Sequence, residues 1–199
     1  MLHLLVPPAC LVCRAPGAEL CRACRRGLPW LPPGPPERTG ALDLVWAPLA
    51  YDGTARALVH ALKLRGLTAA AALMAAQIAA GAPSGVLDAG VLVPVPGNPR
   101  KRRARGFDPA ERIAAALARR TGSRKLVVLR SGAAAAQVGA GRAQRLRRGG
   151  FEVVGDVPER VVLVDDVRTT GATLEACARA LRRSGTVFVA AVTYARTLG

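Results

Sequence analysis

Aromatic residues are scarce in this sequence: they make up 4% of its 199 residues, whereas hydrophobic residues as a whole reach 51%. A buried core is therefore expected, built mostly from Ala, Val and Leu. The same apolar share excludes a disordered basic tail, because such chains have too little apolar surface to fold. No run of about 18 consecutive apolar residues occurs, which argues against a membrane-spanning helix.

Several chemical signatures are also missing. The two histidines, His3 and His60, are too few and too far apart for a histidine-rich metal site. The sequence contains no Gly-Lys-Ser/Thr phosphate loop, no Gly-x-Ser-x-Gly nucleophile motif and no His-Glu-x-x-His zinc motif. The first eight residues lack Lys and Arg and offer only a short apolar run before Pro7, so no secretory signal is expected. We therefore expect a cytoplasmic protein.

Acidic residues are few, with 13 Asp and Glu against 29 Lys and Arg, and the formal net charge is +16. The excess is concentrated in residues 100–150, which carry 15 basic and 2 acidic side chains. A bias in codon usage would explain why Arg outnumbers Lys, but it would not explain this clustering. The pattern indicates a partner rich in phosphates, either nucleic acid (single-stranded DNA against residues 100–150) or a polyphosphorylated small molecule.

Four of the five cysteines form a C-x2-C pattern that is repeated after seven residues. They are Cys10, Cys13, Cys21 and Cys24. Two such pairs supply four thiolates to a tetrahedral ion, and Zn²⁺ suits four sulfurs. Two disulfides or an iron–sulfur cluster are the alternatives, and disulfides require an oxidising compartment. With four protein ligands and no open position, a structural zinc site is expected.

Three regions are expected along the chain: a zinc ribbon over residues 1–30, a Pro/Gly linker over 31–44 and an α/β domain over 45–199. Strands are expected at residues 45–51, 91–95, 126–129, 151–154, 161–164 and 187–192. Helices are expected at residues 54–65, 67–80, 107–120 and 173–183, with Thr54 as the first N-cap. Basic loops are expected at 98–105 and 130–150, the second of them mobile. Alternating strands and helices predict βαβ units and a parallel sheet flanked by helices.

The segment Val161-Val-Leu-Val-Asp-Asp-Val-Arg-Thr-Thr-Gly-Ala-Thr173 carries the sharpest signal for chemistry. Four consecutive apolar residues are typical of a strand buried on both faces of a parallel sheet. The strand is expected to end at Asp165 and Asp166, before a loop of Thr and Gly that leads into a helix. Ligands of open α/β sheets bind at the carboxyl ends of the strands, so a binding site is expected there.

The chemistry of this segment suits a sugar phosphate. The loop and the helix start offer unpaired backbone N–H groups and the positive end of a helix dipole, and Gly171 lets a ligand approach the backbone closely. Asp165 and Asp166 would repel a phosphate, so they are expected to face sugar hydroxyls or a divalent cation. The combination predicts a site for ribose 5-phosphate. An ordinary helix N-cap with acidic neighbours is the alternative interpretation.

This segment resembles the phosphoribosyl-pyrophosphate (PRPP) binding motif of type I phosphoribosyltransferases. Further motifs resemble the ComF family, in which a zinc ribbon is joined to a phosphoribosyltransferase-like domain and which is associated with DNA uptake. In chain order they are the four-cysteine pattern, Tyr51-Asp-Gly, Leu62-Lys-Leu-Arg-Gly66, Val93-Pro-Val-Pro96, Arg105-Gly-Phe-Asp-Pro109, Gln137 and Arg145-Leu-Arg-Arg-Gly-Gly-Phe151. The resemblance covers almost the whole chain. The usual family pattern Arg-Gly-Phe-Asn-Gln is altered here at Asp108 and Pro109.

The resemblance implies a role for each matching residue. Asp165 and Asp166 would hold the ribose hydroxyls, with or without Mg²⁺. The loop that binds PRPP would consist of Thr169, Thr170, Gly171, Ala172 and Thr173. Candidates for holding the pyrophosphate are Arg100, Lys101, Arg103 and Arg105. Residues 45–75 and the zinc ribbon would form a hood over the acceptor, and residues 130–150 would act as a lid.

Two functions follow from these features. The first is a phosphoribosyltransferase that uses PRPP and an acceptor which the sequence does not name. The second is a single-stranded-DNA-associated competence protein whose PRPP site serves as a sensor or is a relic. Steep salt dependence of binding to long oligonucleotides would favour the second function.

Four isolated residues each allow a structural and a functional interpretation. Cys177 is expected to be buried in the core. Trp30 and Trp46 flank the linker and are expected to pack the zinc ribbon onto the domain rather than to stack on bases. Lys63 is equally consistent with a solvated helix residue and with a role near the site.

Overall fold

The computed structural model describes residues 8–131 and 150–198. Its elements are α1 (Arg22–Arg26), β1 (Glu37–Thr39), β2 (Leu42–Trp46), β3 (Leu49–Ala50), α2 (Gly53–Arg65), α3 (Thr68–Gly81), β4 (Val91–Pro94), α4 (Pro99–Arg105), α5 (Pro109–Thr121), β5 (Arg124–Lys125), β6 (Leu129–Ser131), β7 (Phe151–Val153), β8 (Arg160–Arg168), α7 (Ala172–Arg183) and β9 (Phe188–Arg196). In the part of the chain that these elements cover, no helix has the length and apolar content needed to cross a bilayer.

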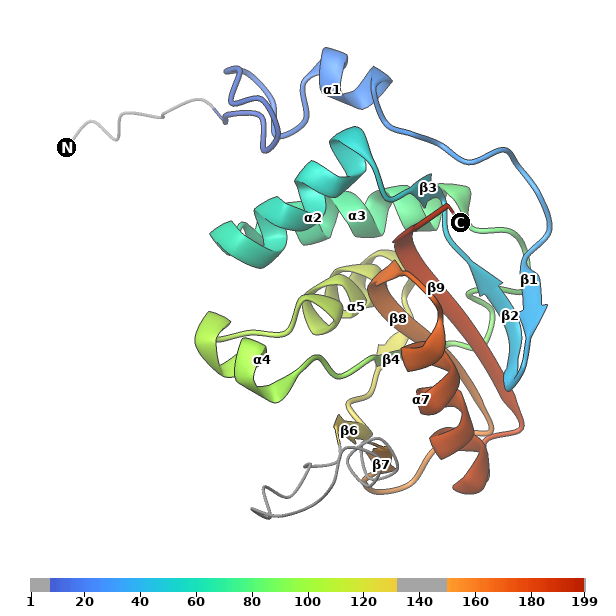
Figure 1. Cartoon of the computed structure of the whole chain (residues 1–199). Helices are drawn as coiled ribbons and strands as arrows, with labels where there is room; N and C mark the ends of the chain where they lie inside the picture. The colour runs from blue at the N-terminus through green and yellow to red at the C-terminus, as the bar shows by residue number, and fades with distance from the viewer. Residues whose placement is uncertain (1–7, 132–149, 199) are drawn as a thin grey trace.

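The central sheet has seven strands in the order β1-β2-β9-β8-β4-β5, with β3 also paired to β9. Only the pairing of β1 with β2 is antiparallel, and the other pairings in this sheet are parallel. Helices α2, α3 and α5 cover one face of the sheet, and α7 covers the other (Figure 1). The expected α/β architecture with a mostly parallel sheet between helices is therefore confirmed.

The two faces of β8 and β9 carry different parts of the core. Val162 and Val164 of β8 pack on the side of α2, α3 and α5, while Val161 and Leu163 pack on the side of α7. This alternation follows from the two-residue period of a strand. Both layers are apolar, so the strands read as uninterrupted apolar runs in the sequence.

The cysteine segment joins the same core. Leu11, Leu20 and Leu28 belong to one buried cluster with Leu58 and Leu62 of α2. The guanidinium of Arg65 donates a 3.0 Å hydrogen bond to the backbone oxygen of Leu11. The segment therefore packs against α2, as Figure 1 shows near the top of the view.

The region before α2 differs in detail from the expectation. The expected strand over 45–51 is divided into β2 and β3, separated by Ala47 and Pro48, and the antiparallel hairpin begins at Glu37, inside the range expected to be linker. The N-cap of α2 is Asp52, two residues before the predicted Thr54, so the helix begins at Gly53. The carboxylate of Asp52 accepts a 2.7 Å hydrogen bond from the N–H of Gly53.

Residues 99–105 form the helix α4, whereas a loop was expected over 98–105. Asn98 caps α4 by accepting hydrogen bonds from the N–H groups of Arg100 and Lys101, and Pro99 occupies the first helical position. Both are standard start signals for a helix. The expectation of a loop over 98–105 was therefore wrong, because the start signals at Asn98 and Pro99 outweigh the repulsion between the basic side chains.

The expected strand at 126–129 is wrong for most of its length: residues 126–128 form no strand, and two short strands, β5 and β6, lie on either side of them. Strand β5 joins the main sheet beside β4, while β6 pairs with β7 in a separate two-stranded sheet. Residues 132–149 lie outside the described residues. The predicted mobile basic loop, its role as a lid and the matching Gln137 fall largely in that range.

Candidate functional site

Strand β8 is longer than predicted, and this changes the setting of the carboxylates. The strand continues to Arg168, because its pairing with β9 persists to the position of Arg168 opposite Arg196. Asp165 and Asp166 therefore lie within the strand instead of after it. The following loop is short, and Gly171 adopts the left-handed conformation (φ 77°) directly before α7.

Asp165 and Asp166 open into a cavity of about 210 Å³, which we call the carboxylate cavity. Its lining consists of Lys63, Gly97, Asn98, Lys101, Arg102, Arg105, Asp108, Pro109, Asp165 and Asp166. Four cationic side chains and three carboxylates thus face one small space. Such a lining fits a ligand that carries both phosphates and hydroxyl groups.

The two aspartates of β8 have different environments. Burial, together with the negative charge of Asp166, raises the pKa of Asp165 well above its usual range. One oxygen of Asp165 accepts a 2.8 Å hydrogen bond from the backbone N–H of Asp166. Asp166 is instead ion-paired, because Nζ of Lys63 lies 2.7 Å from its Oδ1. The structure therefore brings Lys63, which the sequence left undecided, into the site.

Asp108 forms part of the wall of this cavity. Its Oδ1 accepts a 3.1 Å hydrogen bond from the N–H of Ala110, and its Oδ2 accepts a 2.7 Å hydrogen bond from the N–H of Gly97. Burial raises the pKa of Asp108 in spite of these two bonds. Pro109 stands at the first position of α5. The two residues that depart from the family pattern thus form a capped helix start.

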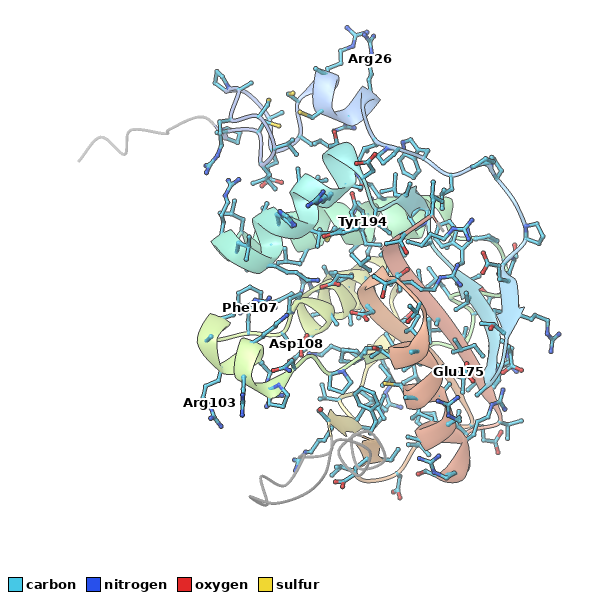
Figure 2. The ribbon with its side chains drawn as sticks, viewed as in Figure 1. Arg26, Arg103, Phe107, Asp108, Glu175 and Tyr194 are labelled. Carbon is cyan, nitrogen blue, oxygen red and sulfur yellow. The ribbon has the colours of Figure 1, made fainter. Side chains whose placement is uncertain are left out.

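The basic residues after β4 divide into two groups. Two of the four predicted candidates, Lys101 and Arg105, line the carboxylate cavity. Arg102, which was not predicted, lines it as well. Arg100 and Arg103 are exposed and do not belong to the lining, and Arg103 extends from the outer side of α4 in Figure 2. The start signal at Asn98 and Pro99 would have revealed this division, because positions 101, 102 and 105 share one face of a helix.

The loop expected to bind phosphate lines a second cavity of about 210 Å³, the loop cavity. Its lining contains Thr169, Thr170, Gly171 and Ala172 together with Glu37, Thr39, Leu42, Val45, Arg168, Glu175 and Thr197. Thr173 is exposed on the first turn of α7 and is not in the lining. The structure therefore divides the predicted ribose phosphate site between two neighbouring cavities.

Glu37 forms ion pairs with two cations beside this loop. Its carboxylate lies 2.8 Å from Nη1 of Arg168 and 2.6 Å from Nη1 of Arg196. The hydrogen bond and the charge of Arg168 lower the pKa of Glu37, although partial burial opposes the effect. An anion that enters the loop cavity would compete with Glu37 for the guanidinium of Arg168.

The four cysteines of the C-x2-C pairs form one cluster. The sulfurs of Cys10, Cys13, Cys21 and Cys24 lie within 4.8 Å of one another, and those of Cys13 and Cys21 are 3.6 Å apart. Four sulfurs at about 2.3 Å from a tetrahedral Zn²⁺ would be separated by a similar distance. The cluster therefore fits a metal ion such as zinc.

The electrostatics of the cluster favour partial ionisation. Burial of Cys10 acts to raise its pKa, but hydrogen bonds from backbone N–H groups and from Cys13 overcome this effect and lower the pKa of Cys10 to about 6. Burial and the neighbouring sulfurs raise the pKa of Cys24. A cation at the centre would favour the thiolate form of all four side chains.

The surroundings of the fifth cysteine and of the two tryptophans fit structural roles. Cys177, on α7, is fully buried in the core, as the sequence predicts. Trp46 packs against Gly81 of α3, where a Cβ atom would meet its ring at 3.3 Å. Trp30 is half-exposed and shares a pocket with Trp46 that is lined mainly by proline and other apolar residues.

Comparisons with known proteins name no relative. No protein-family model matches this chain, and no curated protein shows significant similarity to it.

Proposed function

We propose that this chain binds PRPP and belongs among the ComF-like proteins with a phosphoribosyltransferase-like domain, acting as a phosphoribosyltransferase. The observation that carries the proposal is the carboxylate cavity, in which Asp165 and Asp166 face Lys101, Arg102 and Arg105. Carboxylates suit the hydroxyls of a ribose, and clustered cations suit a pyrophosphate.

The neighbouring loop cavity supports a place for the 5-phosphate. Asp166 and Arg168 are two residues apart on β8, so their Cα atoms are separated by about 7 Å along the strand. A ribose that contacts Asp166 could extend its 5-phosphate toward the loop Thr169–Ala172, where α7 begins. The N-terminus of a helix is favourable for a phosphate.

Within this proposal the protein contributes mainly charge and position. Lys101, Arg102 and Arg105 would stabilise the negative charge that develops on a departing pyrophosphate. Asp165 and Asp166 would orient the ribose and favour the positive charge that develops at C1. The acceptor would approach C1 from the open side of the cavity.

The carboxylates do not fit a Mg²⁺ ion held by the protein alone. Carboxylate oxygens are suitable ligands for Mg²⁺, but Oδ1 of Asp166 is already 2.7 Å from the ammonium of Lys63. Asp165 accepts a backbone hydrogen bond, and burial with a nearby carboxylate raises its pKa. Any Mg²⁺ would therefore arrive as the counter-ion of the PRPP pyrophosphate.

Calorimetric titration of PRPP, with Mg²⁺ present, tests this proposal. We expect the zinc-loaded wild type to bind PRPP and the Asp165→Asn/Asp166→Asn variant to lose binding. Lys101→Ala should weaken binding about tenfold or more, because it removes a charged hydrogen-bond donor. Arg103→Ala is the matched control on the same helix and should have a smaller effect. A folded wild type that does not bind PRPP would exclude the proposal.

A second candidate function is binding of single-stranded DNA, with the PRPP site as a sensor or relic. The exposed face of α4, where Arg100 and Arg103 stand outside the cavity, favours it. A footprint of six to ten phosphates should lose about 10³–10⁵ in affinity between 50 and 200 mM salt. Arg103→Ala should then weaken binding of an oligonucleotide and leave PRPP binding unchanged.

A further inference from the structure

The position of Lys63 separates it from the other cations of the carboxylate cavity. It comes from α2, whereas Lys101, Arg102 and Arg105 come from α4. Its Nζ lies 2.7 Å from Oδ1 of Asp166. Among the described residues, this is the only ion pair that reaches either carboxylate of β8.

Helix α2 holds this ammonium in place. Leu58 and Leu62 are fully buried, so the last turns of α2 are anchored in the core. The side chain of Lys63 is 27% exposed and that of Asp166 is 10% exposed, which shields the pair from water. Screening by solvent and salt is weak for such a pair, so its attraction is stronger than that of a surface ion pair.

An ammonium in this position competes with a divalent cation. A metal ion bound to Oδ1 of Asp166 would sit within a few ångströms of Nζ of Lys63 and would be repelled by it. The same ammonium supplies positive charge to the two carboxylates, and it favours the ionised form of Asp165. The ammonium of Lys63 thus supplies the positive charge that a bound cation would otherwise supply to the carboxylates.

We propose that Lys63 is a positioning residue that acts as the built-in counter-ion of Asp166, so that the carboxylate pair binds a ribose without a divalent cation of its own. The ribose role of the pair rests on the proposed function above. The counter-ion role is a property of the ligand-free protein, and it can be measured without any sugar.

The first experiment uses a metal alone. Mn²⁺ is titrated into the full, zinc-loaded chain, and free Mn²⁺ is followed by electron paramagnetic resonance. We expect Lys63→Met to gain a Mn²⁺ site at least about tenfold tighter than any in the wild type. Adding Asp166→Asn to that variant should abolish the site. Lys63→Gln, which keeps a hydrogen-bond donor without the charge, should also gain it and serves if Lys63→Met does not fold.

Two variants serve as controls: one removes a lysine charge outside the cavity, and the other keeps the charge at position 63. Lys125 has the same exposed fraction as Lys63, 27%, and lies 2.8 Å from Glu111 outside the cavity. Lys125→Met should therefore leave Mn²⁺ binding as in the wild type, and so should Lys63→Arg, which keeps the charge. A wild type that binds Mn²⁺ as tightly as Lys63→Met, or a folded Lys63→Met or Lys63→Gln variant without a new site, would overturn the proposal.

The second experiment uses ribose 5-phosphate, which lacks a pyrophosphate and so needs no metal for itself. Wild-type affinity should be the same, within about twofold, with and without added Mg²⁺. For Lys63→Met we expect about tenfold weaker binding without Mg²⁺ and recovery when Mg²⁺ is added. Wild-type binding that requires Mg²⁺ would overturn the counter-ion role. A wild type that ignores ribose 5-phosphate in both conditions would instead overturn the proposed function, and the Mn²⁺ comparison would still decide the role of Lys63.

Discussion

The carboxylate of Asp108 accepts a 2.7 Å hydrogen bond from the backbone N–H of Gly97. This bond ties the segment that follows β4 to the first turn of α5, and both residues line the carboxylate cavity. The side chain of Asp108 lies so close to the backbone of Gly97 that a Cβ atom on Gly97 would meet Oδ2 of Asp108 at 3.0 Å. The shape of the cavity therefore depends on this contact.

Replacing Asp108 should destabilise the protein. Asp108→Ala removes the N-cap of α5 and leaves the N–H of Gly97 without its partner, which together should cost about 1–3 kcal/mol. Asn98→Ala is the control, since it uncaps the short helix α4, which contributes no buried residue. Urea denaturation should show a clearly larger loss for Asp108→Ala. Equal losses for both variants would contradict this account.

Asp165→Asn should stabilise the protein at neutral pH. Burial and Asp166 raise the pKa of Asp165 in the folded state, so the folded protein binds more protons than the unfolded chain between the two pKa values. Stability of the wild type should therefore fall as pH rises from about 4, the usual pKa of Asp, through the raised folded value.

The variant carries no such ionisable group, so its advantage should be largest above the folded pKa and should vanish below about pH 4. The measurement is the free energy of unfolding in urea across this pH range. Asp156→Asn, at an exposed position, serves as the control and should change stability less. A variant that is less stable than the wild type at pH 7 would show that the charged form of Asp165 is favoured in the fold.

Loss of one cysteine of the cluster should abolish metal binding. Cys13→Ser removes a thiolate from a set of four, and elemental analysis should show zinc content falling from one per chain to near zero. The melting temperature should fall as well, because Leu11 and Leu20 pack on α2 only while the segment is ordered. Cys177→Ala should retain its zinc. Full zinc content in Cys13→Ser would contradict the four-sulfur site.

Glu37→Gln should strengthen binding of inorganic phosphate at the loop cavity. The substitution removes the negative charge that lies 2.8 Å from the guanidinium of Arg168, beside Thr169 and Thr170. We expect a few-fold gain in affinity for phosphate, since exposed charge pairs are worth up to about 1 kcal/mol. Glu111→Gln is the matched control, because Glu111 is similarly exposed and pairs with Lys125 elsewhere. Unchanged affinity in Glu37→Gln would mean that Arg168 does not contact the anion.

Local signals in the sequence were sufficient for several features. The apolar run of β8, the spacing of the four cysteines and the periodicity of α7 each depend on neighbours along the chain, and each is confirmed at its predicted place. Helix α4 was not predicted, although Asn98 and Pro99 are local start signals for a helix.

The features of this protein divide into those that depend on neighbouring residues and those that depend on contacts between distant segments. The sequence by itself determined the α/β class, the cysteine cluster and the identity of the residues around Asp165, because hydrophobic period and short spacings are local properties. Only the tertiary structure decided that Lys63 pairs with Asp166 across 103 positions, that Glu37 reaches Arg168 across 131, and that the loop and the carboxylates line different cavities. These contacts arise when helices pack on the sheet, and the direction in which a side chain points is then set by that packing and not by its neighbours in sequence.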